Sequence, residues 1–471
     1  MENLRCDVCV IGAGSGGLSV AYSASQMGAK VVLVEGGEMG GDCLNYGCVP
    51  SKALIAAASH AHMLGTGGPF GVVPATAKVD FAAVRAHVKN VIASIAPVDS
   101  QERYEALGVR VIRAWARFVS PTDVEAGETR ITARRFVIAT GSKPLIPPIP
   151  GLQDVPYLTN ETVFDLAELP GHLVIIGGGP IGLELAQACR RIGAGVTVLE
   201  AGRVLPREDP DAALTVLDAL RAEGVTVRET APAERVTATG AGICVDAPGG
   251  AVTGTHLLVA AGREVDLSRL GLADGGVAFD SRGVTVDSAM RSSNRRVYAI
   301  GDAAGGAQFT HLANYHAGLV VRQMLFGLPA SLRADHIPRV TYTEPELAQV
   351  GLTEAEARTE HGGRLEVLRF PYAENDRARA ERRTEGFIKV FAVRGRPVGV
   401  TIVGAQAGEL IQIWSLAMAN RLKLAAIANM VAPYPTLGEI GKRAAGAYFV
   451  PRLFENAKVK RIVRGVQRLL P

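Results

Sequence analysis

The feature that most constrains the fold is a glycine-rich turn that occurs twice in the 471-residue chain. The sequence GAGSGG at residues 12–17 follows one apolar stretch, and GGGPIG at residues 177–182 follows another. After each turn come a helical stretch and a second apolar stretch that ends on an acid, Glu35 or Glu200, 18 positions beyond the last glycine. Because strand, glycine turn, helix and strand form one βαβ unit, the repetition predicts an α/β fold built on a duplicated unit.

Each glycine of these two motifs has its own task in dinucleotide binding. The first permits a sharp turn, the second lets a pyrophosphate approach the backbone, and the third lets the helix pack closely on the strand. The amino terminus of the helix then offers free N–H groups and a partial positive charge to the phosphates. We therefore expect two Rossmann-like dinucleotide-binding domains, with contacts from Gly12, Gly14 and Gly17 in the first and from Gly177, Gly179 and Gly182 in the second.

The acid that ends each second strand is expected to accept hydrogen bonds from ribose hydroxyls. Glu35 would do this in the first site and Glu200 in the second. A carboxylate repels a 2′-phosphate, so Glu200 favours NAD over NADP, although the nearby Arg203 weakens that preference.

A cysteine pair lies shortly after the first of these motifs. Cys43 and Cys48 are five residues apart, and a helix with a slightly distorted first turn could join them. Pro50 suits the first turn of a helix, and Lys52 follows Cys48 by one turn. A helix amino terminus and a neighbouring lysine both stabilise a thiolate. Two unrelated buried thiols are the alternative, but the position behind a dinucleotide motif indicates a redox centre supplied by a cofactor.

The amino-acid composition argues against several other classes of protein. Six cysteines in so long a chain do not form an extracellular disulfide framework, which favours a reducing, cytoplasmic setting. A net charge of +4 gives no support for nucleic-acid binding. We expect neither a signal peptide nor a transmembrane segment. No metal site is predicted, because Cys6 and Cys9 fall on the first strand as buried thiols, and Cys189 and Cys244 are expected to be lone core thiols.

The motifs together resemble the class I flavoprotein disulfide reductases, the pyridine nucleotide-disulfide oxidoreductase family of dihydrolipoamide dehydrogenase, glutathione reductase and mercuric reductase. The resemblance covers almost the whole chain. It rests on VIGAGSGG at 10–17, the CxxxxC segment ending VPSK at 43–52, ATGS at 139–142, the second glycine motif, AIGD at 299–302, and TEPE at 343–346 with VGLT at 350–353. It implies FAD in the first site, a nicotinamide nucleotide in the second, and a two-fold homodimer.

The resemblance, together with a change in the sequence pattern near His336, suggests an order of domains. Short strands at 109–112, 135–139 and 256–260 are expected to extend sheets through hairpins. An α+β carboxy-terminal domain is expected after His336. The predicted divisions are an FAD-binding domain at 1–150, an NAD(P)-binding domain at 151–270, the second part of the FAD-binding or central domain at 271–335, a dimerisation domain at 336–450, and a basic amphipathic helix at 451–471.

Residue roles follow from the same resemblance. It implies that Cys48 faces the flavin as a charge-transfer thiolate, that Cys43 exchanges with substrate, and that Lys52 lies by flavin N5. Glu184 would pair with Lys52, because a buried lysine without a carboxylate is costly. Asp302 would bind the ribityl chain. The further residues expected to contact FAD are Gly41, Thr140, Gly141, Ser142, Gln308, Phe309, Thr310 and His311, and Gly262 is expected to contact NAD.

One position departs from the family pattern. Where lipoamide and glutathione reductases have a partner-subunit histidine followed five residues later by a glutamate, this chain has Tyr434 and Glu439. A phenol, with a pKa near 10, is a poor base at neutral pH compared with an imidazole near 6.5. A tyrosine here resembles mercuric reductase, yet the carboxy-terminal vicinal cysteine pair of that branch does not appear in residues 456–471.

Three functional hypotheses remain. The first is an FAD- and NAD(H)-dependent enzyme that passes two electrons through Cys43–Cys48 to a disulfide such as a lipoyl group. The second is a mercuric-reductase-like enzyme that reduces a thiol-bound metal ion. The third is a redox-sensing dimer that binds FAD and NADH with little turnover.

The segment from Asn456 to Leu470 has an apolar stripe at helical spacing and a basic opposite face. We expect this helix to pack on its own domain. Docking to a lipoylated or otherwise acidic carrier protein, or to a membrane surface, is the alternative.

Overall fold

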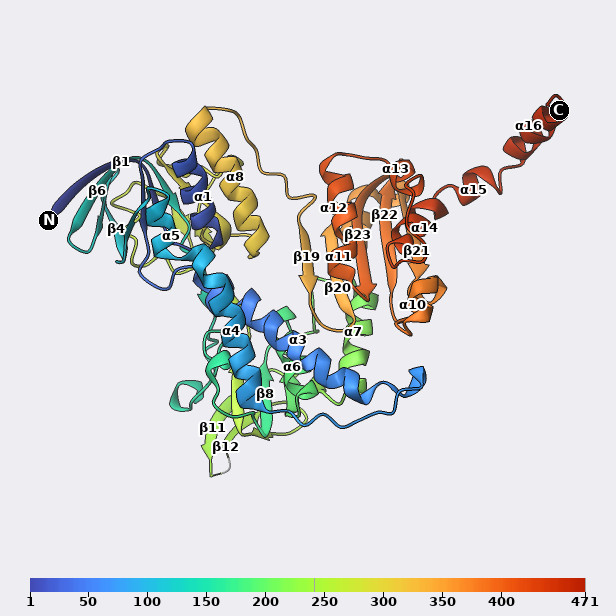
Figure 1. The fold of residues 1–471 in the computed structure, drawn as a ribbon, viewed down its shortest axis with the longest axis horizontal. Helices are drawn as coiled ribbons and strands as arrows, with labels where there is room; N and C mark the ends of the chain where they lie inside the picture. Colours follow the sequence, from blue (N-terminus) through green and yellow to red (C-terminus); the bar gives the residue numbers. More distant parts are fainter. Residues whose placement is uncertain (241, 471) are drawn as a thin grey trace. The chain divides into compact units, whose positions relative to one another are not determined.

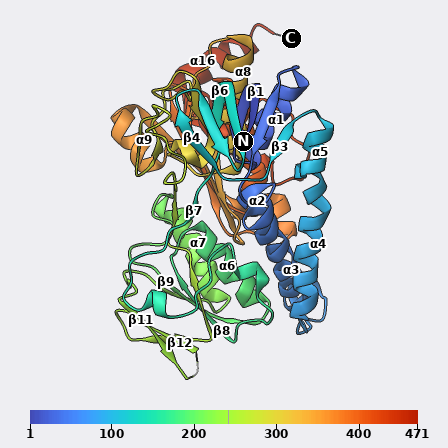
Figure 2. The ribbon, with the colours of Figure 1, turned by 90° about the vertical axis from the view of Figure 1, so that its left-hand side faces the viewer.

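The computed structural model describes residues 1–240 and 242–470 (Figures 1 and 2). The chain divides into two compact units. The first comprises Met1–Ala201 and Arg228–Leu332, and the second comprises Gly202–Val227 and the chain from Arg333 onward. The predicted α/β class is confirmed, since both glycine turns join a parallel strand to a helix as expected.

The main sheet of the first unit has the order β3-β2-β1-β6-β5-β4, with β18 pairing to β6. Strands β1, β2, β3, β6 and β18 pair in parallel, while β4, β5 and β6 form an antiparallel meander. The bounds are β1 (Glu2–Ile11), β2 (Val31–Val34), β3 (Arg110–Ile112), β4 (Ala116–Ser120), β5 (Asp123–Ala126), β6 (Thr129–Ile138) and β18 (Val297–Ala299).

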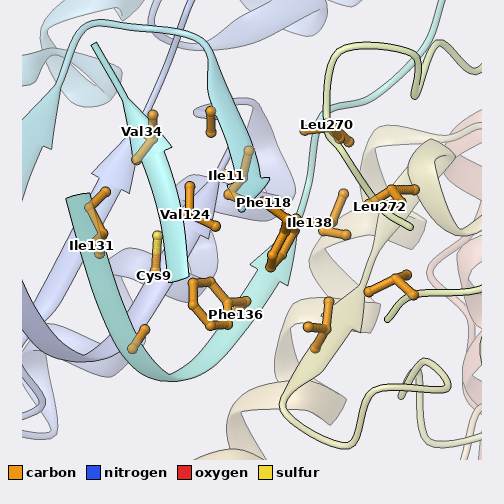
Figure 3. Packing of buried hydrophobic residues seen from close by; sticks show 14 of the residues in the cluster. Cys9, Ile11, Val34, Phe118, Val124, Ile131, Phe136, Ile138, Leu270 and Leu272 are labelled. Carbon is orange, nitrogen blue, oxygen red and sulfur yellow. The ribbon is translucent and has the colours of Figure 1, made fainter. Parts of the chain in front are cut away.

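Alternation along β1 builds a core on each face of this sheet. Val8 and Val10 pack toward α1 (Ser15–Gln26) and α8 (Thr310–Phe326), which lie side by side (Figure 1). Cys9 and Ile11 point to the opposite face. There Phe118 and Phe136 meet edge to face with ring centroids 5.2 Å apart, beside the loop that carries Leu270 and Leu272 (Figure 3).

The second glycine turn belongs to a smaller parallel sheet in the order β10-β9-β8-β14. Its elements are β8 (His172–Ile176), α6 (Pro180–Arg191), β9 (Gly195–Leu199), β10 (Thr226–Arg228) and β14 (His256–Val259). An antiparallel sheet lies beside it, formed by β11 (Arg235–Thr239), β12 (Gly242–Asp246) and β13 (Val252–Gly254). The shortest pairs are β7 (Lys143–Pro144) with β15 (Arg263–Glu264) and β16 (Phe279–Asp280) with β17 (Gly283–Val284).

One expectation about strand connections is wrong. The strands β3 and β14 do not extend their sheets through hairpins, because each pairs in parallel, β3 with β2 and β14 with β8. A parallel pair requires a crossover, and helices α2 (Gly41–Asn45), α3 (Cys48–Gly65), α4 (Phe81–Asp99) and α5 (Gln101–Ala106) fill the crossover before β3. This crossover carries the cysteine pair, and its helix α3 packs against both α4 and α6.

The second unit is an antiparallel sheet in the order β19-β20-β23-β22-β21 covered by helices. The buried Trp414, Tyr372 and Ile402 lie in its core. The strands are β19 (Pro338–Thr341), β20 (Glu346–Gly351), β21 (Leu365–Pro371), β22 (Phe387–Val393) and β23 (Arg396–Gly404). The helices are α7 (Pro210–Ala222), α9 (Glu354–His361), α10 (Asp376–Ala380), α11 (Ala407–Leu410), α12 (Gln412–Ala419), α13 (Leu424–Ala428), α14 (Glu439–Ala447), α15 (Val450–Leu453) and α16 (Ala457–Gln467).

The helix α16 corrects a second expectation. It was expected to pack on its own domain, but none of its residues is buried. The apolar side of the sheet in this unit is already covered by α11 to α14, and Ile411, Trp414, Ile427 and Ile440 fill its core. None of the residues of this core comes from α16. Across the described parts of the chain, no helix is both long enough and apolar enough to cross a bilayer.

Candidate active site

The two cysteines meet because the helix is broken between them. Cys43 lies on α2, whereas Cys48 is the first residue of α3. The break falls at Gly47, where a Cβ would come within 2.8 Å of the Asp42 carboxylate and 3.0 Å of the Asp42 carbonyl oxygen. A glycine at this position therefore allows the chain to turn back toward α2. Both cysteines are free thiols, and Cys48 is the more exposed of the two.

The two thiols have very different affinities for a proton. Cys48 has a pKa lowered to about 6, above all by a hydrogen bond from Cys43, against the effect of burial, and further by Thr310 and by the charge of Lys52. The same hydrogen bond, with burial, raises the pKa of Cys43. The Thr310 hydroxyl lies 3.4 Å from Cys48 Sγ. Near neutral pH the pair therefore holds one thiolate, on Cys48, and one proton, on Cys43.

The ion pair implied by the family resemblance is present. Lys52 Nζ donates to Glu184 Oε2 at 2.8 Å. Lys52 lies one turn after Cys48 on α3, and Glu184 is a buried residue of α6, the helix that follows the second glycine turn. A positive charge is therefore held close to the thiol pair by a carboxylate from a different βαβ unit.

A polar cluster on the same unit includes an arginine that the sequence reasoning missed. Arg263 is largely buried and donates from Nε to Ser142 Oγ and from Nη2 to Ser142 O, both at 2.7 Å. Its guanidinium also lies 3.3 Å from the carboxylate of Asp42, and Ser142 Oγ donates to Asp302 at 2.5 Å. Burial raises the pKa of Asp302, against the lowering effects of Ser142 and Arg263. The only sequence signal for Arg263 was its place directly after Gly262.

The first glycine turn fits a dinucleotide. Gly12 has φ +106°, and a Cβ there would lie 2.4 Å from the carbonyl oxygen of Ala139. A Cβ at Gly17 would lie 1.9 Å from the carbonyl oxygen of Gly12. At Gly14, by contrast, the nearest atom would be 4.0 Å away, at Gly41. The protein itself therefore requires the first and third glycines, and the space at the second is left for a ligand.

The second glycine turn repeats this arrangement. A Cβ at Gly177 or Gly182 would lie 2.3 Å or 2.1 Å from a backbone oxygen, whereas a Cβ at Gly179 would meet nothing within 4 Å. Glu200 accepts from the backbone N–H of Gly178 at 2.6 Å. In the first motif Glu35 accepts from the N–H groups of Ala13 at 2.5 Å and Gly37 at 2.6 Å. Both acids therefore lie against their own glycine turns, where the ribose is expected.

The other residues expected to contact a cofactor differ in where they lie and in how exposed they are. Gly41 is close to the first turn, since a Cβ there would lie 2.8 Å from Gly14 Cα. The rings of Phe309 and His311 stack at the start of α8, with centroids 5.3 Å apart. Thr140 and His311 are exposed, and Gln308 and Gly141 are partly exposed. Gly262 has φ +132° and accepts from the N–H of Leu145.

Tyr434 and Glu439 belong to the second unit. Tyr434 is exposed and donates from Oη to the carboxylate of Asp376 at 2.9 Å. This hydrogen bond is the main cause that raises the pKa of Tyr434. Glu439 is the first residue of α14 and is partly exposed. The phenol therefore keeps its proton in a hydrogen bond to a carboxylate and is not available to accept a proton from a thiol.

The other cysteines are placed as structural residues, with one exception. Cys6 and Cys9 are buried on β1, and burial raises the pKa of both thiols, that of Cys6 to about 12. Cys189 is buried in α6. Cys244 was expected in the core but is only partly buried on β12. In the described ranges no group of three or more His, Cys, Asp or Glu residues is arranged to hold a metal ion.

Comparison with known proteins finds two family models that match this chain. Residues 6–317 match the family model described as pyridine nucleotide-disulphide oxidoreductase, and residues 337–445 match the dimerisation domain of that family. A mercuric reductase from Streptomyces lividans is 34% identical, with 94% of this chain and 96% of the relative covered. A dihydrolipoyl dehydrogenase from Pseudomonas aeruginosa is 36% identical, with 93% and 97% covered.

Among solved structures, the Cu(II) complex of the HOCl-induced flavoprotein disulfide reductase RclA from Escherichia coli has a TM-score of 0.82 at 27% identity. The match covers 93% of this chain and 99% of that one.

Proposed function

Since the chain belongs to the pyridine nucleotide-disulphide oxidoreductase family, we propose that it passes two electrons from a nicotinamide nucleotide, through FAD, to the Cys43–Cys48 pair and on to a disulfide substrate. The observation that carries this proposal is the pair itself. Two free thiols share a hydrogen bond, and one of them has a pKa lowered to about 6. FAD, when bound, supplies the two-electron chemistry that links the nicotinamide to the sulfurs.

Other residues of the chain are proposed to bind the two nucleotides and to orient the flavin. Gly12, Gly14, Gly17, Glu35 and Gly41 are proposed to hold FAD. Gly177, Gly179, Gly182, Glu200 and Gly262 are proposed to hold the nicotinamide nucleotide. Lys52, held by Glu184, keeps a positive charge near the flavin and the Cys48 thiolate, while Asp302, Ser142 and the loop 308–311 orient the flavin.

The thiol pair would reduce a disulfide in two exchange steps. The Cys48 thiolate takes the proton of Cys43, whose sulfur then attacks one sulfur of the substrate and releases the other as a thiolate. Cys48, once its proton has passed to solvent or to the released thiolate, attacks Cys43 and releases the second substrate thiolate. A Cys43–Cys48 disulfide remains, and the next two electrons reduce it.

Reduction of a thiophilic metal ion is the second candidate, and Tyr434 is the observation that favours it. A disulfide substrate benefits from an acid–base group near the thiols, and Tyr434 is held as a donor to Asp376. A metal ion delivered to two thiolates has less need of such a group. Relatives named mercuric reductase and the Cu(II) complex of RclA make mercuric and cupric ions the acceptors to test.

The nucleotide donor, the dimer and the cellular setting are part of the same proposal. We infer NADH as the preferred donor, because a carboxylate such as Glu200 at the end of the second strand would repel a 2′-phosphate. The dimerisation domain supports a homodimer, in which we infer that Tyr434 and Glu439 of one subunit lie beside the thiol pair of the other. Low cysteine use favours a reducing, cytoplasmic setting.

An anaerobic titration with NADH tests the route of the electrons. The flavin-loaded protein is expected to develop a long-wavelength absorption band at two electrons per subunit. Cys48→Ser should abolish the band, and Cys189→Ser, a change at a buried thiol remote in sequence, should leave it intact. A band that survives in Cys48→Ser would contradict the role given to that thiol.

Steady-state oxidation of NADH then separates the acceptors. Lipoamide, a lipoylated protein, mercuric ion and cupric ion are compared at equal enzyme concentration. Turnover with the disulfides supports the first candidate, and turnover with the metal ions alone supports the second. Negligible turnover with all four would favour a redox sensor and contradict both.

A further inference from the structure

The helix α16 is a complete amphipathic element that nothing in its own unit covers. The Asn456 side chain caps its first turn by accepting from the N–H groups of Lys458 and Val459. Its apolar residues recur at spacings of three and four, which gathers them on one side. They are Val459, Ile462, Val463 and Val466, followed by Leu469 and Leu470, and all except Val459 are exposed.

The opposite side of α16 is strongly basic. Lys458, Lys460, Arg461, Arg464 and Arg468 contribute five positive charges, and residues 457–470 include no acid. Within the part of the chain that the structure describes, no carboxylate forms an ion pair with any of these five side chains. The charge is therefore free to act on a partner.

The short helix α15, which precedes α16, is attached to the rest of its unit. Arg452 on α15 donates to both carboxylate oxygens of Glu366 at 2.8 and 2.7 Å, and its guanidinium stacks 3.6 Å from the ring centroid of Tyr448. Beyond this anchor the chain leaves the domain. Phe454 is 69% exposed, and α16 stands clear of the sheet of its own unit (Figure 1). The helix is thus a tethered element and not part of the core.

We propose that α16 docks the protein on the surface of an anionic phospholipid bilayer. One occupant then accounts for both sides of the helix. The apolar stripe enters the boundary between headgroups and acyl chains, and the lysines and arginines lie among the anionic headgroups. A carrier protein that presented only an acidic surface would match the charge but would leave the stripe of isoleucine, valine and leucine exposed to water. The neighbouring Phe454 and Leu453 are exposed as well and extend the apolar contact.

Vesicle flotation of the full-length flavin-loaded protein tests the proposal. Vesicles of phosphatidylcholine alone are compared with vesicles in which about one third of the lipid is phosphatidylglycerol, at low and high salt. The protein should bind the anionic vesicles at least about ten-fold more tightly than the zwitterionic ones, and salt should weaken this binding. Equal binding to both kinds of vesicle, or binding to neither, would overturn the proposal.

Matched variants identify the helix as the docking element. Arg461→Glu with Arg464→Glu should weaken binding to anionic vesicles at least about ten-fold. Arg295→Glu with Lys423→Glu makes the same change in net charge at exposed positions elsewhere and should change binding little. Equal loss in both double variants would overturn the proposal, because bulk charge alone would then explain binding.

The apolar side needs its own readouts. Ile462→Gln with Val466→Gln should also release the protein from anionic vesicles, and Leu469→Trp should show a blue-shifted fluorescence when vesicles are added. These variants should retain flavin, dimer mass and NADH oxidation. If Ile462→Gln with Val466→Gln instead dissociates the dimer, a second copy covers the stripe and the proposal fails. Binding to a lipoylated protein without binding to vesicles would also overturn it.

Discussion

Lys52 Nζ lies 2.8 Å from Glu184 Oε2, which joins the helix that carries Cys48 to the helix that follows the second glycine turn. The carboxylate is buried, so the pair holds the ammonium group in one place in the first unit. Because an unpaired charge at such a site is costly, each partner depends on the other. The arrangement gives the thiol pair a fixed positive neighbour.

Replacement of Lys52 by methionine should raise the pKa of Cys48. The hydrogen bond from Cys43 has the largest lowering effect and remains, but the charge of Lys52, which also lowers that pKa, is removed. Alkylation of Cys48 by iodoacetamide in the reduced protein, followed as a function of pH, reports the thiolate. The wild-type midpoint should lie at about 6, and Lys52→Met should move it upward and slow alkylation at pH 6 by about threefold or more.

Glu184→Gln is the matched control, because it keeps the lysine charge and removes the acid that compensates it. Its alkylation midpoint should not rise. An unchanged midpoint in Lys52→Met would show that the ammonium group has no effect on the thiolate.

A pair of glycine variants should separate binding from folding at the second dinucleotide site. Gly179 has φ −78°, an ordinary value, and a Cβ there meets nothing within 4 Å. Gly179→Ala should therefore keep the melting temperature but raise the KM for NADH by about ten-fold or more, because its methyl group occupies the pyrophosphate space. Gly182→Ala, whose Cβ would lie 2.1 Å from the carbonyl oxygen of Gly177, should lower the melting temperature. Equal KM values in wild type and Gly179→Ala would contradict the assignment of this turn to the nucleotide.

A histidine at position 434 should improve reactions that require proton transfer at the thiols. Tyr434 donates to Asp376, and that hydrogen bond raises its pKa, so the phenol stays protonated throughout the neutral range. Tyr434→His offers an imidazole instead and should increase turnover with lipoamide by about ten-fold or more. The increase should appear as a limb near pH 6 to 7 in the pH–rate profile, the range in which imidazole titrates.

Tyr434→Phe serves as the control for this change. Because the phenol is not proposed to transfer a proton, its loss should leave lipoamide turnover within about threefold of wild type. A large loss in Tyr434→Phe would show that the hydroxyl group takes part in the reaction.

The parts of the fold that could be predicted are those with a local signal. The two glycine turns can be recognised in the sequence because all the residues of each motif lie within one βαβ unit, and both turns fold as expected. The meeting of Cys43 and Cys48 depends on a helix break at Gly47 that the spacing alone does not reveal. Arg263 was missed because its partners Ser142 and Asp42 lie more than a hundred residues earlier in the chain. The exposure of α16 was also missed, since an amphipathic pattern indicates an apolar partner without saying where it is.

The second unit contains a charge cluster around the buried Lys389 and Asp209 that no sequence pattern indicated. Lys389 on β22 donates to both carboxylate oxygens of Asp209 at 3.0 and 2.9 Å, and to Asp211 at 2.7 Å and Glu354 at 3.2 Å. Asp209 is 1% exposed and also caps α7 through the N–H groups of Asp211 and Ala212. The lysine therefore holds the amino terminus of α7 against the sheet.

Lys389→Met should destabilise the protein by about 3 kcal/mol, because it leaves the Asp209 carboxylate buried without its cation. Urea unfolding at neutral pH measures the loss. Arg358→Met, which removes an exposed partner of Glu354, should cost only about 0.5 kcal/mol. Similar losses in both variants would contradict the importance given to burial.

The cluster also predicts a pH dependence with a definite sign. The hydrogen bond from Lys389 lowers the pKa of Asp211 below its ordinary 3.8, so the folded state binds fewer protons than the unfolded state in that range. This contribution to stability is complete above pH 3.8 and is lost as the pH falls through the folded-state pKa. On the alkaline side, the carboxylates hold the pKa of Lys389 above its ordinary 10.5 despite burial, so that contribution is present below pH 10.5 and is lost as the pH rises further.

Lys389→Met should remove both limbs, so the difference in melting temperature between wild type and variant should be largest between about pH 5 and 9 and should narrow toward either extreme. A difference that stays constant from acid to alkaline pH would show that the lost stability comes from packing and not from these charges.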